Sequence, residues 1–258
     1  MSGGITAVVA TRLEKAAVDN GFERPLGREG DWLAFGSSQC PMRIWLSSLG
    51  DTLILAAFSQ ANVGRALGEY GTPLSSPLPA GAVAGRTVTT IPALNALVRR
   101  AFQLAKTLPN ELLRAFENAT ASMPRTTEAE RLVVQRVGQD FFRNGLIEVW
   151  EGRCAITGLA VRELLRASHI KPWADCASDE ERLDAFNGLL LAPHLDAAFD
   201  RGFITVGDDG TVSCSPLLDD DARGLLGLAG SLKVRGLTDA HRAYLAWHRE
   251  RVFRLEGG

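Results

Sequence analysis

The feature that most constrains this chain is the stretch from residue 166 to residue 202, where short apolar runs are separated by Pro and Gly breakers. Its first part, Ser168–Trp173 (SHIKPW), has strand character and is closed by a proline. Its second part, Asn187–Leu191 (NGLLL), is an apolar run that begins with a turn signal. After it, Pro193 suits the first turn of a helix and Gly202 suits its end, which predicts one short helix.

Two aspartates lie in this predicted helix. Asp196 and Asp200 are four residues apart, so they fall on one helical face with their carboxylates close together. Like charges at that spacing repel each other, and a hard divalent cation between them relieves the repulsion. For an isolated pair of this kind, a plain solvated face is the alternative interpretation.

A single histidine, His169, occurs in the strand-like part. Its imidazole, with an ordinary pKa of about 6.5, suits the removal of a proton from water near neutral pH. A structural histidine with satisfied hydrogen bonds is the alternative. Asn187 taken alone indicates only a turn.

Taken together, ASHIKPW, NGLLL and DAAFDRG form an ordered set that resembles the HNH endonuclease motif. The resemblance covers roughly residues 125–255, including the helical segment RVGQDFFRNGL, the Cys154–Gly158 turn and the tail segment YLAWHRERVF. It implies the fold of that family, a β-hairpin packed on a helix around one metal ion (the ββα-metal finger).

The resemblance also implies a role for each matched residue. His169 would be the general base, and Asn187 would pin the hairpin loop and help to orient the imidazole. Asp196 stands where the final histidine of the motif is usual, and Asp200 falls on a second metal-ligand position. Ser168 stands beside the base, where many members have a metal-binding Asp or His.

Two carboxylates as ligands favour Mg²⁺ or Mn²⁺ over Zn²⁺. The Ser168 hydroxyl is a weak ligand, so His194 or water is expected to complete the coordination. Many HNH proteins also carry structural zinc on paired CxxC turns. Here Cys154-Ala155-Ile156-Thr157 keeps only the first cysteine, so we expect no structural zinc and a small buried role for Cys154.

Three cations flank the motif: Arg166, Lys171 and Arg201. Each could bind backbone phosphates, with Arg201 the strongest candidate, and ordinary surface charge is the alternative for each. The resemblance implies that water attacks the phosphodiester while His169 takes its proton. The metal ion would stabilise charge on the leaving 3′ oxygen, giving 5′-phosphate and 3′-hydroxyl ends.

Residues 1–110 are predicted to form a small α+β domain. Periodicity and breakers predict helices over 5–20, 61–71 and 92–106, strands over 31–36, 42–48 and 52–59 with a turn at Ser48–Asp51, and a loop over 71–85. No chemical motif occurs in this part. From the architecture alone, we expect it to serve recognition or regulation.

Residues 111–258 are predicted to form an HNH nuclease domain with flanking helices, which makes the chain α+β overall. Thr127 and Glu130 predict a capped helix that starts near residue 126, and Asn144-Gly145 predicts its end. After the motif, residues 203–215 read as a β-hairpin.

A helix near 238–254 closes the chain. The segment 233–254 holds six Lys and Arg residues against two acidic ones, and it is a candidate basic face or an ordinary solvated helix. A local face is needed for nucleic-acid binding because the net charge of the chain is −2. His241 and His248 on this helix are expected to be surface or packing residues.

The remaining composition bears on the setting of the protein. No apolar run is long enough to span a bilayer, and the N-terminus lacks the pattern of a secretory signal. The four cysteines form no CxxC pair, which predicts a reduced, cytoplasmic setting. A homodimer is compatible with the sequence, but nothing in it indicates one.

The leading hypothesis is a DNA endonuclease, of a restriction or other defence system, whose residues 1–110 choose the substrate. One alternative is a nucleic-acid-binding module in which the fold persists but Ser168 leaves catalysis weakened. Another is a nuclease that is gated by a ligand or partner bound at the N-terminal domain.

Overall fold

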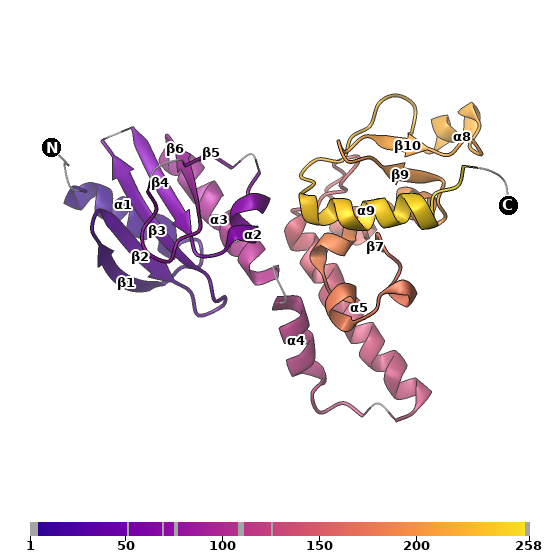
Figure 1. Ribbon diagram of the computed structural model, residues 1–258, viewed down its shortest axis with the longest axis horizontal. Coiled ribbons are helices and arrows are strands. Elements are labelled where there is room, and N and C mark those ends of the chain that lie inside the picture. Colours follow the sequence, from indigo (N-terminus) through magenta and orange to yellow (C-terminus); the bar gives the residue numbers. More distant parts are fainter. Residues whose placement is uncertain are drawn as a thin grey trace. The chain divides into compact units, whose positions relative to one another are not determined.

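The computed structural model describes residues 5–50, 52–68, 70–74, 77–107, 111–124 and 126–255. The chain forms two compact units, Met1–Pro109 and Asn110–Gly258, and each is described here by itself. Helices and antiparallel sheets occur in both (Figure 1), so the predicted α+β class is confirmed. The predicted boundary after residue 110 falls on residues 108–110, outside the described part of the chain.

The N-terminal unit is built on a six-stranded antiparallel sheet of order β1-β2-β3-β4-β6-β5. Its strands are β1 (Arg24–Glu29), β2 (Trp32–Gly36), β3 (Arg43–Leu49), β4 (Leu53–Phe58), β5 (Thr72–Pro73) and β6 (Ala84–Val88). Its helices are α1 (Ala7–Val18), α2 (Ala61–Ala66) and α3 (Ile91–Thr107). Strand β3 is buried on both faces: Ile44 and Leu46 lie on one, and Trp45 packs with Ala34 and Ala57 on the other.

Most of the elements predicted for this unit are confirmed, and two predictions need correction. Strand β1 was not predicted, because its six residues (RPLGRE) are all exposed and lack alternation. The predicted loop over 71–85 is wrong in part, since β5 and the first two residues of β6 fall within it. Strand β5 pairs with Arg86 and Thr87 of β6, and Ala84 and Gly85 pair with β4. Asp51 of the predicted turn, and Ser75 and Ser76 of the predicted loop, lie outside the described residues.

The C-terminal unit places two small hairpins among its helices. Strand β7 (Arg166–His169) pairs antiparallel with β8 (Gly188–Leu191), and β9 (Ile204–Val206) pairs with β10 (Val212–Cys214). The α-helices are α4 (Glu111–Thr120), α5 (Glu128–Val149), α6 (Asp179–Arg182), α7 (Pro193–Asp200), α8 (Asp220–Leu225) and α9 (Asp239–Arg251). Short 3-10 turns occur at Arg162–Leu164, Trp173–Asp175 and Ala185–Asn187.

Helix α5 begins as predicted and ends later than predicted. Thr127 and Glu130 form the expected capping box at its start. Gly145 does not end the helix. A Cβ at this position would lie 2.4 Å from Leu112 Cδ1, so the glycine lets α4 approach closely. Helix α4, which was not predicted from the sequence, lies beside α5 (Figure 1), and its packing there explains why α5 continues past Gly145.

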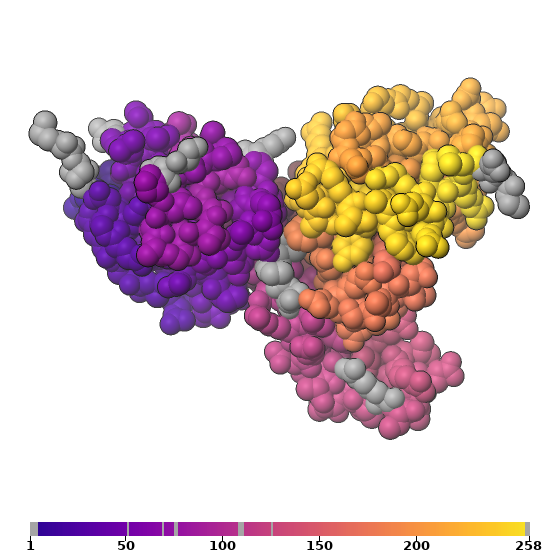
Figure 2. Space-filling view, viewed as in Figure 1, coloured from indigo at the N-terminus to yellow at the C-terminus, as the bar shows by residue number. Residues whose placement is uncertain are grey.

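Helix α9 lies on the surface of the C-terminal unit (Figure 2) and turns His241, Leu245 and His248 inward. Three of the six cations of the segment 233–254 form ion pairs among the described residues. Arg242 pairs with Asp239, Arg249 with Asp208 at 2.8 Å and Lys233 with Asp209 at 3.3 Å. The ordinary surface interpretation of this helix is therefore favoured. No helix among the described residues is long and apolar enough to cross a membrane.

We expect the stability of the protein to fall between pH 6.5 and pH 4, in part because of His241. Burial lowers the pKa of His241 to about 3. In the unfolded chain its pKa is about 6.5, so over this window the unfolded state binds a proton that the folded state does not. The loss amounts to at most about 1.4 kcal/mol per pH unit for this histidine.

Urea unfolding of wild type and His241→Gln at several pH values measures this effect. Nδ1 of His241 accepts the Thr238 backbone N–H at 3.2 Å, and Gln can supply an acceptor at the same capping position. The variant should show a shallower loss of stability with falling pH, whatever its stability at pH 7. Identical pH slopes for both proteins would contradict the prediction.

Candidate active site

A cleft of about 580 Å³ lies beside the β7–β8 hairpin. It is lined by α5, by β7 and the loop that follows it, by α7 and by the end of α9. From α5 the lining residues include Arg136, Gln139, Asp140, Phe142 and Arg143; from β7 they include Arg166, Ser168 and His169. Trp173 of the following loop, Asp196 and Asp200 of α7, and His248 of α9 complete this lining. The structure therefore brings the predicted histidine, serine and both aspartates to one cavity.

The carboxylates of Asp196 and Asp200 face this cleft from α7. The buried hydroxyl of Ser168 donates a hydrogen bond to Asp200 Oδ1 at 3.1 Å. Loss of hydration raises the pKa of both carboxyls, and the charge of Asp196 raises that of Asp200 further. The predicted pair of repelling acids on one helical face is thus present, with Ser168 beside it.

These residues fit a hard divalent cation. Among the described residues, no Lys or Arg forms an ion pair with either Asp196 or Asp200, so their charge is not neutralised by direct pairing. Carboxylate and hydroxyl oxygens are the donors that Mg²⁺ and Mn²⁺ prefer. No three His, Cys, Asp or Glu side chains of the described chain converge as a metal group. His194 is exposed on α7 and does not line the cleft, which leaves water to complete the coordination.

The ring of His169 is held in one orientation and one tautomer. It stacks on Phe142 with centroids 3.7 Å apart, and Trp173 meets its edge. Nε2 lies 2.9 Å from the backbone oxygen of Arg182. A carbonyl oxygen only accepts, so Nε2 carries the hydrogen and Nδ1 keeps a free lone pair. Burial lowers the pKa of His169 to about 4, so the ring is neutral at pH 7 and able to accept a proton.

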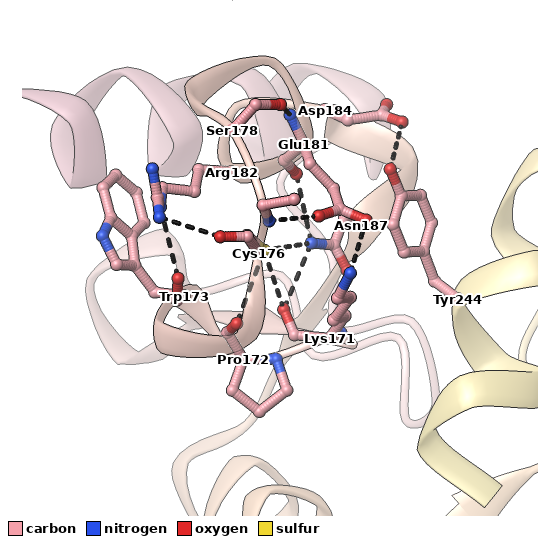
Figure 3. Close-up of polar contacts among 11 residues, drawn as sticks. Lys171, Pro172, Trp173, Cys176, Ser178, Glu181, Arg182, Asp184, Asn187 and Tyr244 are labelled. Atoms are coloured by element: carbon pink, nitrogen blue, oxygen red, sulfur yellow. Dashed lines mark hydrogen bonds and ion pairs between the residues drawn. The ribbon is translucent and has the colours of Figure 1, made fainter. Parts of the chain in front are cut away.

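Asn187 fastens the loop between β7 and β8 from inside (Figure 3). Its side chain is fully buried; Oδ1 accepts the Lys171 backbone N–H at 2.8 Å. Its Nδ2 donates to the backbone oxygens of Lys171 and Glu181, both at 3.2 Å. The role of pinning the hairpin loop fits this geometry. Asn187 does not line the cleft, and the hydrogen bonds given above all hold the loop.

Arg182 shapes the same loop, and no sequence pattern indicated this role. Its guanidinium donates to the backbone oxygens of Cys176 at 2.8 Å and Trp173 at 3.3 Å (Figure 3). A third bond joins it to Asp179 at 2.9 Å. These contacts fix the segment whose own carbonyl accepts the hydrogen bond from His169, so Arg182 holds the His169 ring through its backbone.

The three predicted phosphate-binding cations have different surroundings. Arg166 is exposed and lines the cleft. Lys171 does not line it: its ammonium pairs with Glu181 at 2.7 Å, and both side chains are mostly buried. Arg201 is exposed at the end of α7, outside the lining of the cleft. The structure therefore supports Arg166 for this role and leaves Lys171 engaged elsewhere.

Cys154 connects the turn before the motif to α7. Its buried sulfur accepts the backbone N–H groups of Thr157 and Ala192, each at 3.4 Å. The prediction of a small buried residue is confirmed. The thiol helps to position the start of α7, and thereby the two aspartates that follow.

Comparison with known families matches residues 154–207 to the HNH endonuclease model. The matched segment is about a fifth of the chain and contains β7, β8 and α7, the elements that carry the histidine and the acids. The C-terminal half of the chain therefore contains an HNH domain. A comparison with curated proteins finds no match.

Asn187→Ala should lower the free energy of unfolding of the C-terminal unit by about 2–4 kcal/mol, because it leaves several buried backbone groups without partners. Asn144→Ala, at an exposed position on α5, is the matched control and should change stability by less than about 0.5 kcal/mol. Urea titration compares the two variants. Equal effects of the two variants would show that the hydrogen bonds of Asn187 contribute nothing to stability.

Proposed function

We propose that this protein is a metal-dependent endonuclease that hydrolyses DNA phosphodiester bonds, with His169 as the general base. One observation carries the proposal: an imidazole of fixed tautomer shares a single cleft with a pair of carboxylates that form no ion pair with a Lys or Arg of the described chain. A base beside a site for a hard divalent ion is the arrangement that phosphodiester hydrolysis needs. The family match on the same segment supports this reaction class.

The chain's own residues account for the proton transfer. Nδ1 of His169 accepts the proton of the attacking water, and the Arg182 carbonyl bonded to Nε2 stabilises the imidazolium that forms. An anionic phosphate in the cleft raises the pKa of the ring above its value in the free protein, since negative charge favours the protonated form. Phe142 holds the plane of the ring throughout.

Asp196, Asp200 and Ser168 would hold the metal ion, with Mg²⁺ or Mn²⁺ favoured by the oxygen donors. When bound, such an ion neutralises charge on the phosphoryl and leaving oxygens. Arg166, exposed in the same cleft, binds a backbone phosphate and orients the strand. The products are 5′-phosphate and 3′-hydroxyl ends.

The N-terminal unit, in this proposal, selects the DNA or gates cleavage, as in a restriction or other defence system. A second candidate is a binding module that has the fold without the activity. The observation that favours it is the presence of Ser168, a neutral and weak ligand, beside only two carboxylates. Duplex DNA that is shifted in a gel but not cut with Mg²⁺ or Mn²⁺ would select this second candidate.

His169→Gln should lower the cleavage rate by about 10²–10⁴-fold, because Gln can still donate to the Arg182 carbonyl but has no basic nitrogen. His194→Ala is the matched control on α7 and should keep the wild-type rate. Plasmid nicking with Mn²⁺ gives the rates, and thermal melting verifies that both variants fold. Near-native cleavage by His169→Gln would show that His169 is not the general base.

Asp200→Ala should weaken Mn²⁺ binding at least tenfold, since it removes one of two charged ligands. Asp220→Ala, which alters a fully exposed acid on α8, is the control and should bind Mn²⁺ like the wild type. Isothermal titration calorimetry without DNA measures both. An unchanged titration for Asp200→Ala would discard the ligand assignment, whatever the cleavage assay shows.

A further inference from the structure

Charges of both signs line the cleft in equal number. Three arginines (Arg136, Arg143 and Arg166) face three aspartates (Asp140, Asp196 and Asp200). The formal charges of these six side chains cancel, so removal of one arginine leaves acidic groups in excess among them and weakens the attraction for a phosphate chain.

Arg136 is the arginine of α5 that is available to a ligand. It shares one face of the helix with Gln139, Asp140 and Arg143, at i, i+3, i+4 and i+7. The guanidinium of Arg143 is committed to the backbone oxygens of Leu165 at 2.6 Å and Arg162 at 3.0 Å. Arg136 is exposed, and no ion pair or hydrogen bond of its side chain occurs among the described residues.

We infer that α5 forms a second, phosphate-binding wall of the cleft, in which Arg136 binds a backbone phosphate of the nucleic-acid strand held for cleavage. Gln139, one turn further along the same face, supplies an amide donor to the same backbone. This inference rests on the proposed function and extends it, because Arg136 lies outside the segment 154–207 that matches the family. Contacts of this kind position the strand and carry no sequence preference.

The position of α5 supports this assignment. Phe142 of α5 stacks on His169, so the helix is fixed relative to the base. Gly138, between Arg136 and Gln139, lets Trp173 approach: a Cβ there would lie 2.8 Å from Trp173 Cη2. A phosphate bound at Arg136 would therefore lie on a helix that is packed directly against the loop between β7 and β8.

The test is a DNA-binding measurement without cleavage. Arg136→Gln is made in the His169→Gln background, and binding of a short fluorescein-labelled duplex is followed by anisotropy with Mg²⁺ over a range of NaCl concentrations. The dissociation constant should rise roughly fivefold to tenfold near 0.1 M salt, and the slope of log K against log[salt] should fall by about 0.9. The change should be the same for duplexes of different sequence.

Two further variants make the result specific. Arg136→Lys keeps the charge and should keep most of the salt slope. Arg131→Gln removes an arginine from an exposed position on the same helix outside the cleft, and it should bind DNA as the parent does. If Arg136→Gln and Arg131→Gln behave alike while the parent binds DNA, the wall on α5 is disproved and the nuclease proposal stands. If the parent binds no DNA and the wild type cuts none, both proposals fail.

Discussion

The hydrogen bond from the His169 ring to the Arg182 carbonyl is the constraint on which the rest of the site depends. It fixes which ring nitrogen is free, and it exists only because the loop between β7 and β8 is folded back onto the strand. Asn187 and the Arg182 guanidinium hold that loop through backbone groups that local secondary structure leaves without partners. Tyr244 of α9 adds a further bond, to Asp184 at 2.9 Å.

The carboxylate pair on α7 is governed by electrostatics. Asp196 and Asp200 lie on one face of a short helix. Loss of hydration raises the pKa of both carboxyls, and the charge of Asp196 raises the pKa of Asp200 further. Nothing in their surroundings among the described residues relieves this by direct ion pairing. In the proposed function, a divalent cation between the two carboxylates would relieve this unfavourable electrostatics, so local instability and metal binding would have one cause.

Several features of the site follow directly from local sequence patterns. The two strands of the hairpin, the helix that carries both aspartates and the capped start of α5 arise from short stretches whose breakers and periodicity act within a few residues. The end of α5 could not be predicted in this way. The position of this helix end depends on Leu112 of α4 packing against Gly145, and no local sequence pattern predicts that contact.

By itself, the sequence determined which residues can do chemistry and in what order they occur: a histidine in a strand, an asparagine at a turn, and two acids one helical turn apart. The tertiary structure alone decided the free nitrogen of His169, the pairing of Lys171 with Glu181, and the presence of Arg136 beside the acids. Side-chain periodicity is a property of one segment, whereas a tautomer, an ion pair or a shared cleft requires atoms from segments that meet only when the chain folds.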